Sequence, residues 1–288
     1  MNGVCIGVIG NGFVGKATQI FGRSDKVRCI VYDVDPKKCY PLGTTMDTIA
    51  ALCDIIFVCV PTPMNVANGG ECDTSIVKHV VQELLKAKSK IIIRSTVPPG
   101  TCEKLQVAHM PEYLTEAHWE QDFINCVEWH LGVDQSNAEL ADKFSELLRA
   151  CKASNVIKSD KLIVKPTKVT ETTKYFKNAM LAVRVSLCNE FEEYCRAINV
   201  DYNDVRNMFT SDPRIGRSHT MVPGHDGQRG FGGTCLPKDV SGLIVAMLEA
   251  GVAPTVLYAV KTRNETVDRP DCDWLQNLGR AVSNNKQI

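Results

Sequence analysis

Short β-branched runs alternate with helical patterns over the first 165 residues of this 288-residue chain, and this alternation constrains the fold most. Strands separated by helices predict βαβ units and a parallel, doubly wound sheet. The clearest predicted strands are residues 4–9, 28–32, 55–60 and 90–94, with weaker ones near 107 and at 129–133, 154–157 and 162–164. The nearly continuous apolar run at 53–60 suits a strand that helices cover on both faces.

The pattern changes near residue 165, where one long helical pattern begins and continues to about residue 200. Its apolar side chains recur every three or four residues, as one face of a helix requires. They are Phe176, Met180, Val183, Leu187, Phe191, Tyr194 and Ile198. A short helix (204–209), a Gly-rich loop (223–233) and an apolar helix (240–250) follow. We therefore expect a sheet domain at 1–165, an all-α domain built on one long helix at 166–270, and a polar, loosely ordered tail at 271–288.

Composition narrows the class of protein. The formal net charge is zero, which argues against nucleic acid or an anionic membrane as the main partner. The longest apolar run, 55–60, is far shorter than the roughly 20 residues of a membrane-spanning helix. The first five residues contain no basic side chain, so we expect no secretory signal there. The thirteen cysteines are scattered singly, without zinc-site spacing or the look of a disulfide framework. We expect reduced thiols, no metal, and a cytoplasmic protein.

A G-x-G-x-x-G motif follows the first predicted strand and opens a helix, which is the context of a dinucleotide-binding, Rossmann-like turn. The first glycine permits the tight turn, the second lets the backbone approach a pyrophosphate, and the third lets helix and strand pack closely. Asp33, after the second predicted strand, suits the ribose hydroxyls and would repel a 2′-phosphate, which favours NAD over NADP. The predicted contacts are Gly10, Gly12, Phe13, Val14, Gly15, Asp33 and Lys38. A turn-starting role for Asp33 and a surface role for Lys38 stay open.

A second segment, Phe-Gly-Gly-Thr-Cys-Leu-Pro-Lys-Asp at 231–239, carries the candidate chemistry. Cys235 follows flexible glycines, and Lys238 and Asp239 come soon after it. A nearby ammonium favours the thiolate, which is the nucleophilic form of cysteine. A buried structural cysteine is the alternative, and these flanking residues alone do not decide between the two.

With this segment the chain resembles the UDP-glucose/GDP-mannose dehydrogenase family, whose active-site signature is F-G-G-x-C-L-P-K-D. Further segments resemble the family's motifs in the same order, from about residue 3 to about residue 265. They are the glycine loop (8–15), V-P-T-P (60–63), S-T-V-P-P-G-T (95–101), P-E-Y-L with Glu116 (111–116), Lys174 with Asn178, and D-P-R-I-G (212–216).

The resemblance implies an NAD-dependent, four-electron oxidation of a nucleotide sugar through a thiohemiacetal and a thioester on Cys235. Lys174 and Asn178 would stabilise oxyanions, Asp239 would help hold a water, and Thr96 and Glu112 would position or deprotonate the hydrolytic water. Further cofactor contacts would come from Pro61, Thr62, Ser95, Thr96, Glu116 and Lys238. Substrate contacts would come from Tyr113, Leu114, Lys174, Asn178, Arg214, Phe231, Gly232 and Gly233. From the residues alone, a solvated helix face is the favoured interpretation of Lys174 and Asn178. Glu112 and Glu116 could be helix-start carboxylates, and Thr96 a helix N-cap.

The chain departs from the family pattern in two places. Family members usually carry a third, C-terminal α/β domain that supplies basic contacts to the UDP pyrophosphate, and we expect this sequence to lack it. The helix-rich stretch that the family usually has between Asp33 and Asp54 is also mostly lacking. The segment 217–230 is longer than expected. One hypothesis is that its Arg217, His219, His225 or Arg229 contacts the substrate phosphates, and the alternative is a mobile loop with incidental charges.

The resemblance also implies a homodimer built on the long helix, with Arg214 reaching the neighbouring subunit's site. The D-x-R-I-G stretch favours UDP-glucose, with UDP-glucuronate as product, and GDP-mannose stays open. A two-electron 3-hydroxyacid dehydrogenase shares the domain order and a helical Lys/Asn pair but lacks the cysteine signature. An NAD-binding protein that is inactive without a partner domain is the remaining alternative.

Overall fold

The structure, a computed structural model, describes residues 3–283, without the side chains of residues 88 and 89. It divides into two compact units. The sheet unit comprises Met1–Thr62 and Thr74–Lys174, and the helical unit comprises Pro63–Asp73 and Tyr175–Ile288. The division differs from the expected boundary at residue 165, because the first turns of the long helix bond to the sheet unit. Thr170 contacts His109, and Glu171 accepts hydrogen bonds from the backbone of Gly100 and Cys102.

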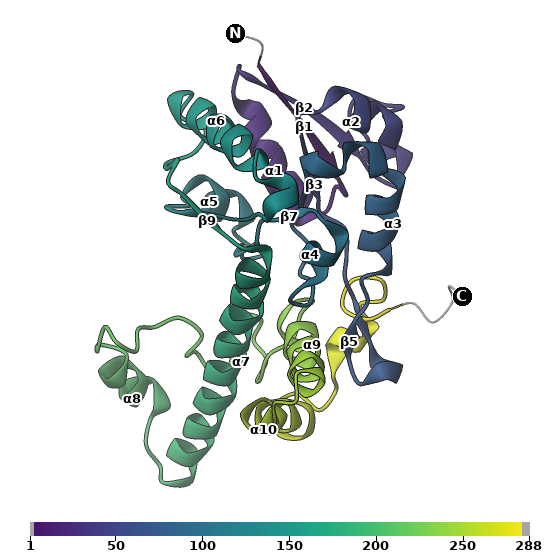
Figure 1. The fold of residues 1–288 in the computed structure, drawn as a ribbon. Coiled ribbons are helices and arrows are strands. Elements are labelled where there is room, and N and C mark those ends of the chain that lie inside the picture. The colour runs from purple at the N-terminus through teal and green to yellow at the C-terminus, as the bar shows by residue number, and fades with distance from the viewer. Residues whose placement is uncertain (1–2, 284–288) are drawn as a thin grey trace. The chain divides into compact units, whose positions relative to one another are not determined.

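The sheet unit is built on a seven-stranded sheet of order β2-β1-β3-β6-β7-β8-β9 (Figure 1). Its strands are β1 (Val4–Ile9), β2 (Val27–Tyr32), β3 (Ile55–Val58), β6 (Ile91–Ile93), β7 (Ala108–His109), β8 (Trp129–Gly132) and β9 (Leu162–Lys165). All neighbouring pairs are parallel except β7 and β8, which are antiparallel. The predicted Rossmann-like α/β class is confirmed, and the expectation of a wholly parallel sheet is wrong at that one pair.

Helices cover both faces of this sheet. On one face α1 (Phe13–Thr18), α5 (Trp119–Ile124) and α6 (Leu140–Ala153) contribute to one apolar core, and on the other α2 (Met46–Leu52), α3 (Ser75–Glu83) and α4 (Thr101–Leu105) contribute to a second. Alternate residues of β3 enter the two cores: Ile55 and Phe57 the first, Ile56 and Val58 the second. This period of two explains why the β3 run is apolar throughout.

Short 3-10 turns complete the unit at Gln19–Arg23, Pro36–Lys38, Leu85–Lys90 and Gln135–Asn137. The predicted strand at 154–157 is absent from the described residues, since Ser154 ends α6 and Asn155 has φ +57°. A residue in this left-handed conformation does not continue a strand. Val156 and Ile157 still pack against the first core, so their apolar character reflects burial in a loop.

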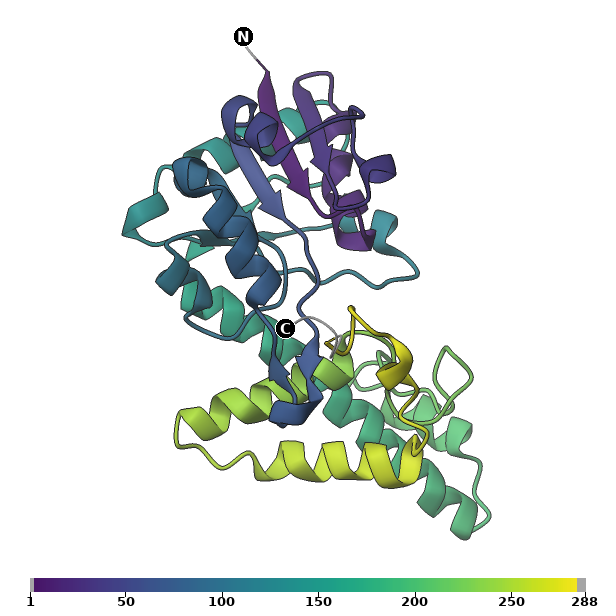
Figure 2. The same cartoon turned by 90° about the vertical axis from the view of Figure 1, so that its right-hand side faces the viewer.

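The helical unit contains most of α7 (Thr167–Ala197), with α8 (Tyr202–Phe209), α9 (Leu236–Glu249) and α10 (Thr255–Arg263). Figure 2 shows α9 and α10 side by side, and both pack with Tyr175, Ala179 and Ala182 of α7 in one core. A π-helical turn, Asn264–Asp268, extends α10. The predicted all-α region built on one long helix is confirmed, with a small hairpin added by β4 (Met64–Asn65) and β5 (Glu71–Cys72) around the 3-10 turn Val66–Asn68.

The segment after residue 270 is packed, which contradicts the expected loose tail for residues 271–283. It forms the 3-10 turn Asp273–Gln276, in which Trp274 is buried. The Met64 amide donates to the Ala281 carbonyl (2.8 Å), and the Ser283 amide donates to the Met64 carbonyl (3.0 Å). Residues 271–283 contain too few apolar side chains to give a periodic pattern in the sequence. The buried Trp274 and the backbone hydrogen bonds to Met64 nevertheless order this segment. Residues 284–288 lie outside the described part.

Six of the seven side chains of the predicted apolar stripe, at α7 and just beyond its end, face away from the core of their unit, whereas Val183 packs against that core. Phe176, Met180 and Tyr194 are 55%, 63% and 65% exposed, and Leu187, Phe191 and Ile198 are also exposed. The helix instead packs through smaller side chains such as Ala179, Ala182 and Ser186. Within the described residues no helix has the length and apolar character that crossing a membrane requires.

Candidate active site

The glycine turn between β1 and α1 has the geometry that its motif predicts. Gly10 has φ +92°, and a Cβ there would lie 2.7 Å from the Cys59 carbonyl oxygen. A Cβ at Gly15 would collide with the Gly10 carbonyl oxygen, so helix and turn pack too closely for any side chain. A Cβ at Gly12 would meet nothing within 4 Å. The backbone therefore stays open at Gly12, followed by Phe13 and Val14 in the first turn of α1, which fits the approach of a pyrophosphate.

Asp33 directly follows β2 and holds the glycine turn. Its Oδ2 accepts the Asn11 amide (2.7 Å) and its Oδ1 accepts the Asp35 amide (2.9 Å). Each carboxylate oxygen keeps capacity for a further hydrogen bond, as ribose hydroxyls would require. Lys38 is exposed, and its ammonium lies 3.8 Å from the Asp35 carboxylate. This position agrees with a surface role for Lys38, which was one of its two possible roles.

Two loops at the carboxyl ends of β3 and β6 are tied together, where ligands bind in open α/β sheets. The Ser95 hydroxyl donates to the Val60 carbonyl (2.6 Å), and the Thr62 hydroxyl donates to the Thr96 carbonyl (2.7 Å). Pro61 is exposed between them. The predicted cofactor residues Pro61, Thr62, Ser95 and Thr96 thus form one connected edge.

Glu171 is a residue that the sequence motifs missed. Its side chain is fully buried and accepts the amides of Gly100 (2.5 Å) and Cys102 (2.7 Å), which anchors the end of the 95–101 loop on α7. Burial raises the pKa of this carboxyl, and the two amides oppose that shift. In the sequence Glu171 is only one acid in the first turns of the predicted helix, and its burial, which marks it as special, is visible in the structure alone.

A buried ion pair joins the predicted residues Glu112 and Lys174. The Lys174 Nζ lies 3.2 Å from Glu112 Oε2, and the two side chains are only 5–6% exposed. Glu112 also accepts the Leu114 amide. This placement rules out the solvated-face interpretation of Lys174 and the helix-start interpretation of Glu112. Tyr113 bonds to His130 (3.4 Å), and burial raises the pKa of Tyr113 to about 12, whereas Glu116 is exposed.

The thiol of Cys235 lies at the N-terminus of α9, beside a second buried network. Asp239 is 1% exposed; its Oδ1 lies 2.5 Å from Lys238 Nζ and its Oδ2 accepts Asn178 Nδ2 at 2.5 Å. Burial opposes the charge of Lys238, but the negative charges of Asp239 and of a Cys235 thiolate outweigh it and raise the pKa of Lys238. Lys238 therefore stays cationic close to Cys235.

No disulfide forms among the thirteen cysteines, all of which lie in the described part.

The residues before Cys235 are held in place. Phe231 is buried, Gly232 lies against the Arg269 guanidinium, and Gly233 is exposed with φ +73°. The Gly-rich loop is thus not freely mobile at this end.

Arg214 is 87% exposed and forms an ion pair with Asp212 at 2.6 Å.

Arg229, one of the residues considered for a phosphate contact, has partners within the chain. Its guanidinium forms an ion pair with Glu192, donates to the Asn189 carbonyl (3.0 Å) and lies 3.8 Å from Asp268. These partners favour a structural role for Arg229 over a phosphate contact. Arg217 donates to Asn207 (2.6 Å) and is exposed, and His219 bonds to Ser218 (2.7 Å).

The predicted site residues therefore form two groups, each inside one unit. The glycine turn, the 60–62 and 95–96 loops, and the Glu112–Lys174 pair belong to the sheet unit, whereas Asn178, Cys235, Lys238 and Asp239 belong to the helical unit. Lys174 and Asn178 are one turn apart on the continuous helix α7. The dinucleotide turn of the sheet unit is typical of one class of protein, the NAD-dependent dehydrogenases.

Comparison with known proteins narrows this class to one family. The model for the NAD binding domain of the UDP-glucose/GDP-mannose dehydrogenase family matches residues 39–152, and the model for the family's central domain matches residues 168–266. The chain belongs to the UDP-glucose/GDP-mannose dehydrogenase family. The prediction of NAD as cofactor is confirmed by the first of these domains.

Individual relatives agree with this assignment. The chain is 31% identical to the UDP-glucose 6-dehydrogenase of Pseudomonas aeruginosa over 231 residues, which cover 73% of this chain and 48% of the relative. It resembles the structure of a UDP-glucose dehydrogenase from Pyrobaculum islandicum with a TM-score of 0.77 and 25% identity, over 91% of this chain and 68% of the other. The chain spans about half the length of the curated relatives it matches.

A 3-hydroxyisobutyrate dehydrogenase from Mycobacterium tuberculosis has a similar fold. The TM-score is 0.66 over 90% of this chain and 91% of that one, at 14% identity. This similarity shows a shared fold only.

Proposed function

We propose that the protein catalyses the NAD-dependent, four-electron oxidation of the primary alcohol of a nucleotide sugar to a carboxylate, with UDP-glucose as substrate and UDP-glucuronate as product. The observation that carries this proposal is the Cys235 thiol beside a cationic Lys238, which is itself fixed by buried Asp239. An oxidation that stopped at an aldehyde would need no such thiol. The name of the P. aeruginosa relative supports UDP-glucose over GDP-mannose.

The proposed reaction proceeds through an aldehyde, a thiohemiacetal and a thioester. Gly10, Gly12 and Asp33 would hold NAD, which would supply the hydride acceptor for both oxidations. The primary alcohol first loses a hydride and a proton to become an aldehyde. Cys235 Sγ then bonds to the aldehyde carbon, and the carbonyl oxygen takes a proton. The resulting thiohemiacetal loses a second hydride and its hydroxyl proton to become a thioester. Water attacks this thioester, the C–S bond breaks, and the thiolate and the carboxylate are released.

The charged side chains suit these steps. Each step places negative charge on the substrate oxygen, and we assign Lys174 and Asn178, one turn apart on α7, to stabilise it. Glu112 is held by Lys174 and by the Leu114 amide, which keeps a carboxylate in a fixed position. We assign Glu112 as the base for the hydrolytic water, Thr96 as its positioning group, and Asp239 as the anchor of Asn178 and Lys238.

Positive charge in the helical unit supports an anionic substrate. Partial burial lowers the pKa of His219, and the positive charges of Arg184, His225 and Lys177 lower it further. Arg184 also donates to the Gly216 carbonyl (2.8 Å), which ties this loop to α7. We propose that Arg217, His219 and His225, with Arg184 and Lys177 and without Arg229, bind the substrate diphosphate.

The exposed α7 stripe supports a homodimer. Six large apolar side chains line one face of a long helix, and contiguous exposed apolar surface of this kind marks an interaction site. We propose that the stripe pairs with a second copy and that the exposed Arg214 reaches the partner's substrate. A cytoplasmic location suits a chain whose thirteen cysteines form no disulfide in the described part.

The test mixes purified protein with NAD and UDP-glucose and measures NADH per sugar consumed. Two NADH per sugar are expected, and Cys235→Ala should abolish the second, while Cys272→Ser, a control at another partly exposed cysteine, should leave the yield unchanged. Turnover with GDP-mannose in place of UDP-glucose would revise the substrate. One NADH per substrate in the unaltered protein would favour a two-electron 3-hydroxyacid dehydrogenase. NAD binding without turnover of any substrate would favour the partner-dependent alternative.

A further inference from the structure

Cys235 is anchored on its C-terminal side and needs a separate anchor on its N-terminal side. It begins α9, and its carbonyl accepts the Asp239 amide at 3.0 Å, so the helix holds that side. The preceding segment, residues 224–234, lies outside any regular helix or strand and contains exposed Gly233 with φ +73°. Since glycine backbone rotates freely, the thiol position also depends on what holds the chain before Gly233.

Asn264 clamps Phe231 by both of its backbone groups. The Phe231 amide donates to Asn264 Oδ1 (2.8 Å), and Asn264 Nδ2 donates to the Phe231 carbonyl (2.9 Å). Asn264 and Phe231 are 1% and 4% exposed, so water does not compete for these bonds. The side-chain amide thereby replaces the strand partner that this backbone lacks.

Arg269 supports the next residue, Gly232. A Cβ on Gly232 would lie 2.5–2.8 Å from the Arg269 guanidinium, so the guanidinium lies directly against the glycine backbone. Asp273 holds the guanidinium by two bonds of 2.7 Å, and Asp226 holds it by one of 2.6 Å. Because Asp226 belongs to the loop itself, Arg269 ties the start of the loop to its end.

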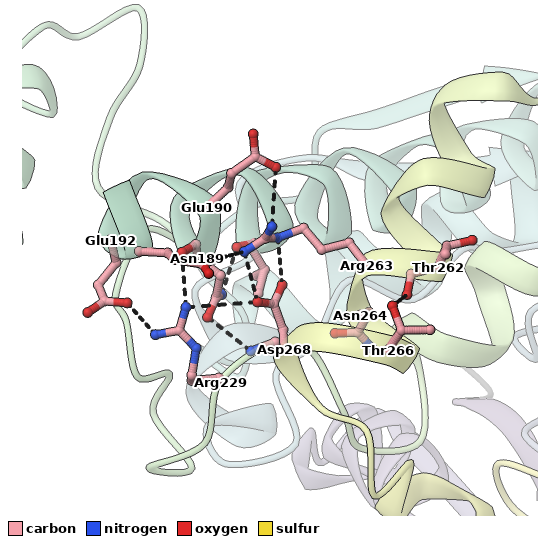
Figure 3. A network of polar contacts seen from close by, with 12 residues as sticks. Asn189, Glu190, Glu192, Arg229, Thr262, Arg263, Asn264, Thr266 and Asp268 are labelled. Carbon is pink, nitrogen blue, oxygen red and sulfur yellow. Dashed lines mark hydrogen bonds and ion pairs between the residues drawn. The ribbon is translucent and has the colours of Figure 1, made fainter. Parts of the chain in front are cut away.

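A single π-helical turn presents both of these side chains. The Arg269 amide donates to the Asn264 carbonyl (2.8 Å), which closes the turn Asn264–Asp268 at the end of α10. Figure 3 shows Asp268 of this turn between Arg229 and Arg263. Asn189 of α7 accepts the Gly230 amide (3.2 Å), so the clamp is continuous with α7. Single π-turns in α-helices occur frequently at functional sites.

We propose that Asn264 and Arg269 are positioning residues that set the location of the Cys235 thiol through Phe231 and Gly232. The inference rests on the proposed function for its effect on turnover, but not for its effect on the thiol. With the clamp in place, the loop cannot swing about Gly233, and Sγ stays close to the Lys238 ammonium. Without it, the thiol spreads over several positions and loses both its alignment with an aldehyde and its proximity to the cation.

The test measures the alkylation rate of Cys235 by iodoacetamide as a function of pH, by mass spectrometry of the peptide that contains it. Asn264→Ala removes both clamp bonds. The midpoint of its pH profile should move up, because the thiol would spend less time beside the Lys238 ammonium, which favours the thiolate. If the proposed function holds, kcat should also fall by about 100-fold, the cost of a misplacement of about 1 Å, with little change in the KM for NAD.

Two further variants keep the test decisive. Thr266→Ala is the matched control, because Thr266 is in the same π-turn but is exposed and bonds only to the Thr262 carbonyl at 2.7 Å (Figure 3). It should leave the profile and kcat unchanged. Asp273→Asn weakens the hold on Arg269 at a half-exposed position, so it tests the clamp even if Asn264→Ala fails to fold, and should shift the profile by less.

The outcomes separate the two proposals. A shifted profile in Asn264→Ala or Asp273→Asn together with an inactive unaltered protein would support the positioning role and count against the proposed function. An unaltered profile in both of these variants, when folded, would overturn the positioning role whatever the activity. An equal shift in Thr266→Ala would also overturn it, since a general loosening of the turn would then explain the effect.

Discussion

At the scale of single residues, the site depends on charges that are buried but paired. Lys174 and Glu112 are almost fully enclosed, and so are Lys238 and Asp239. Breaking such a pair leaves one charge buried without compensation, which costs more than the pair itself contributes. If these residues have the roles proposed above, stability and catalysis are linked at these positions, and experiments need to separate them.

Lys174→Met tests this link. It should lower kcat by about 100-fold or more, because an oxyanion contact is lost. It should also lower the free energy of unfolding by about 3–5 kcal/mol, because Glu112 stays buried without a positively charged partner. Urea unfolding and steady-state kinetics measure the two effects. The double variant with Glu112→Gln should recover much of the stability and none of the activity. Lys168→Met, at an exposed lysine of the same helix, is the control. Full activity in Lys174→Met would remove Lys174 from the mechanism.

His109 should make the stability depend on pH. Burial, and next the charge of Lys174, lowers the pKa of His109 to about 3 from 6.5. Between these two values the unfolded chain binds a proton that the folded chain does not. The free energy of unfolding should therefore fall as the pH falls below about 6.5, by up to about 1.4 kcal/mol per pH unit from this residue.

Urea unfolding at about pH 6.5 and at about pH 5 measures this contribution. The unaltered protein should lose about 2 kcal/mol more than His109→Asn over that interval. His118→Asn, at an exposed histidine, should behave like the unaltered protein. Equal losses in the unaltered protein and His109→Asn would show that His109 titrates normally in the folded state.

At the scale of elements, α7 acts as the common support of separate loops. Its first turns carry Glu171, which holds the 95–101 loop, and Lys174, which holds Glu112. Further along, Asn178 bonds to Asp239, and Asn189 holds Gly230. Within each unit, α7 thus holds loops that are distant from it in the sequence.

Glu171→Gln should loosen the 95–101 loop without touching the cofactor turn. A glutamine keeps one acceptor but turns an NH₂ group towards one of the two amides, so one bond is lost. We expect a fall of about 1–3 kcal/mol in the free energy of unfolding and about 10-fold weaker NAD binding by calorimetry, which corresponds to about 1.4 kcal/mol. Glu103→Gln, at an exposed glutamate, serves as the control. Unchanged NAD affinity in Glu171→Gln would separate this loop from the cofactor site.

At the scale of the whole molecule, the exposed stripe of α7 predicts the oligomeric state. Light scattering at micromolar concentration should give a dimer for the unaltered protein. Met180→Glu places a charge in the middle of the stripe and should give a monomer, because burying an unpaired carboxylate opposes association. Leu42→Glu, at an exposed leucine of the sheet unit, should stay dimeric. A monomeric unaltered protein would refute the proposed dimer.

Features set by near neighbours were predictable from the sequence. The bounds of β1 coincide with those predicted, and α7 lies within the predicted helical stretch. The steric demands at Gly10 and Gly15 could be inferred from their spacing. Strand and helix periods and glycine sterics act over a few residues, so a sequence displays them directly.

Tertiary structure decided the features that join distant segments. The periodic stripe of α7 was visible in the sequence, but only the packing of Ala179 and Ala182 shows that the stripe faces outwards. The order around Trp274 depends on the hairpin at Met64, more than 200 residues earlier. The clamp of Asn264 on Phe231 likewise joins residues with no shared motif. Such contacts form wherever the folded chain brings a hydrogen-bond donor close to an acceptor. The two residues have no fixed separation in the sequence, so no sequence pattern predicts them.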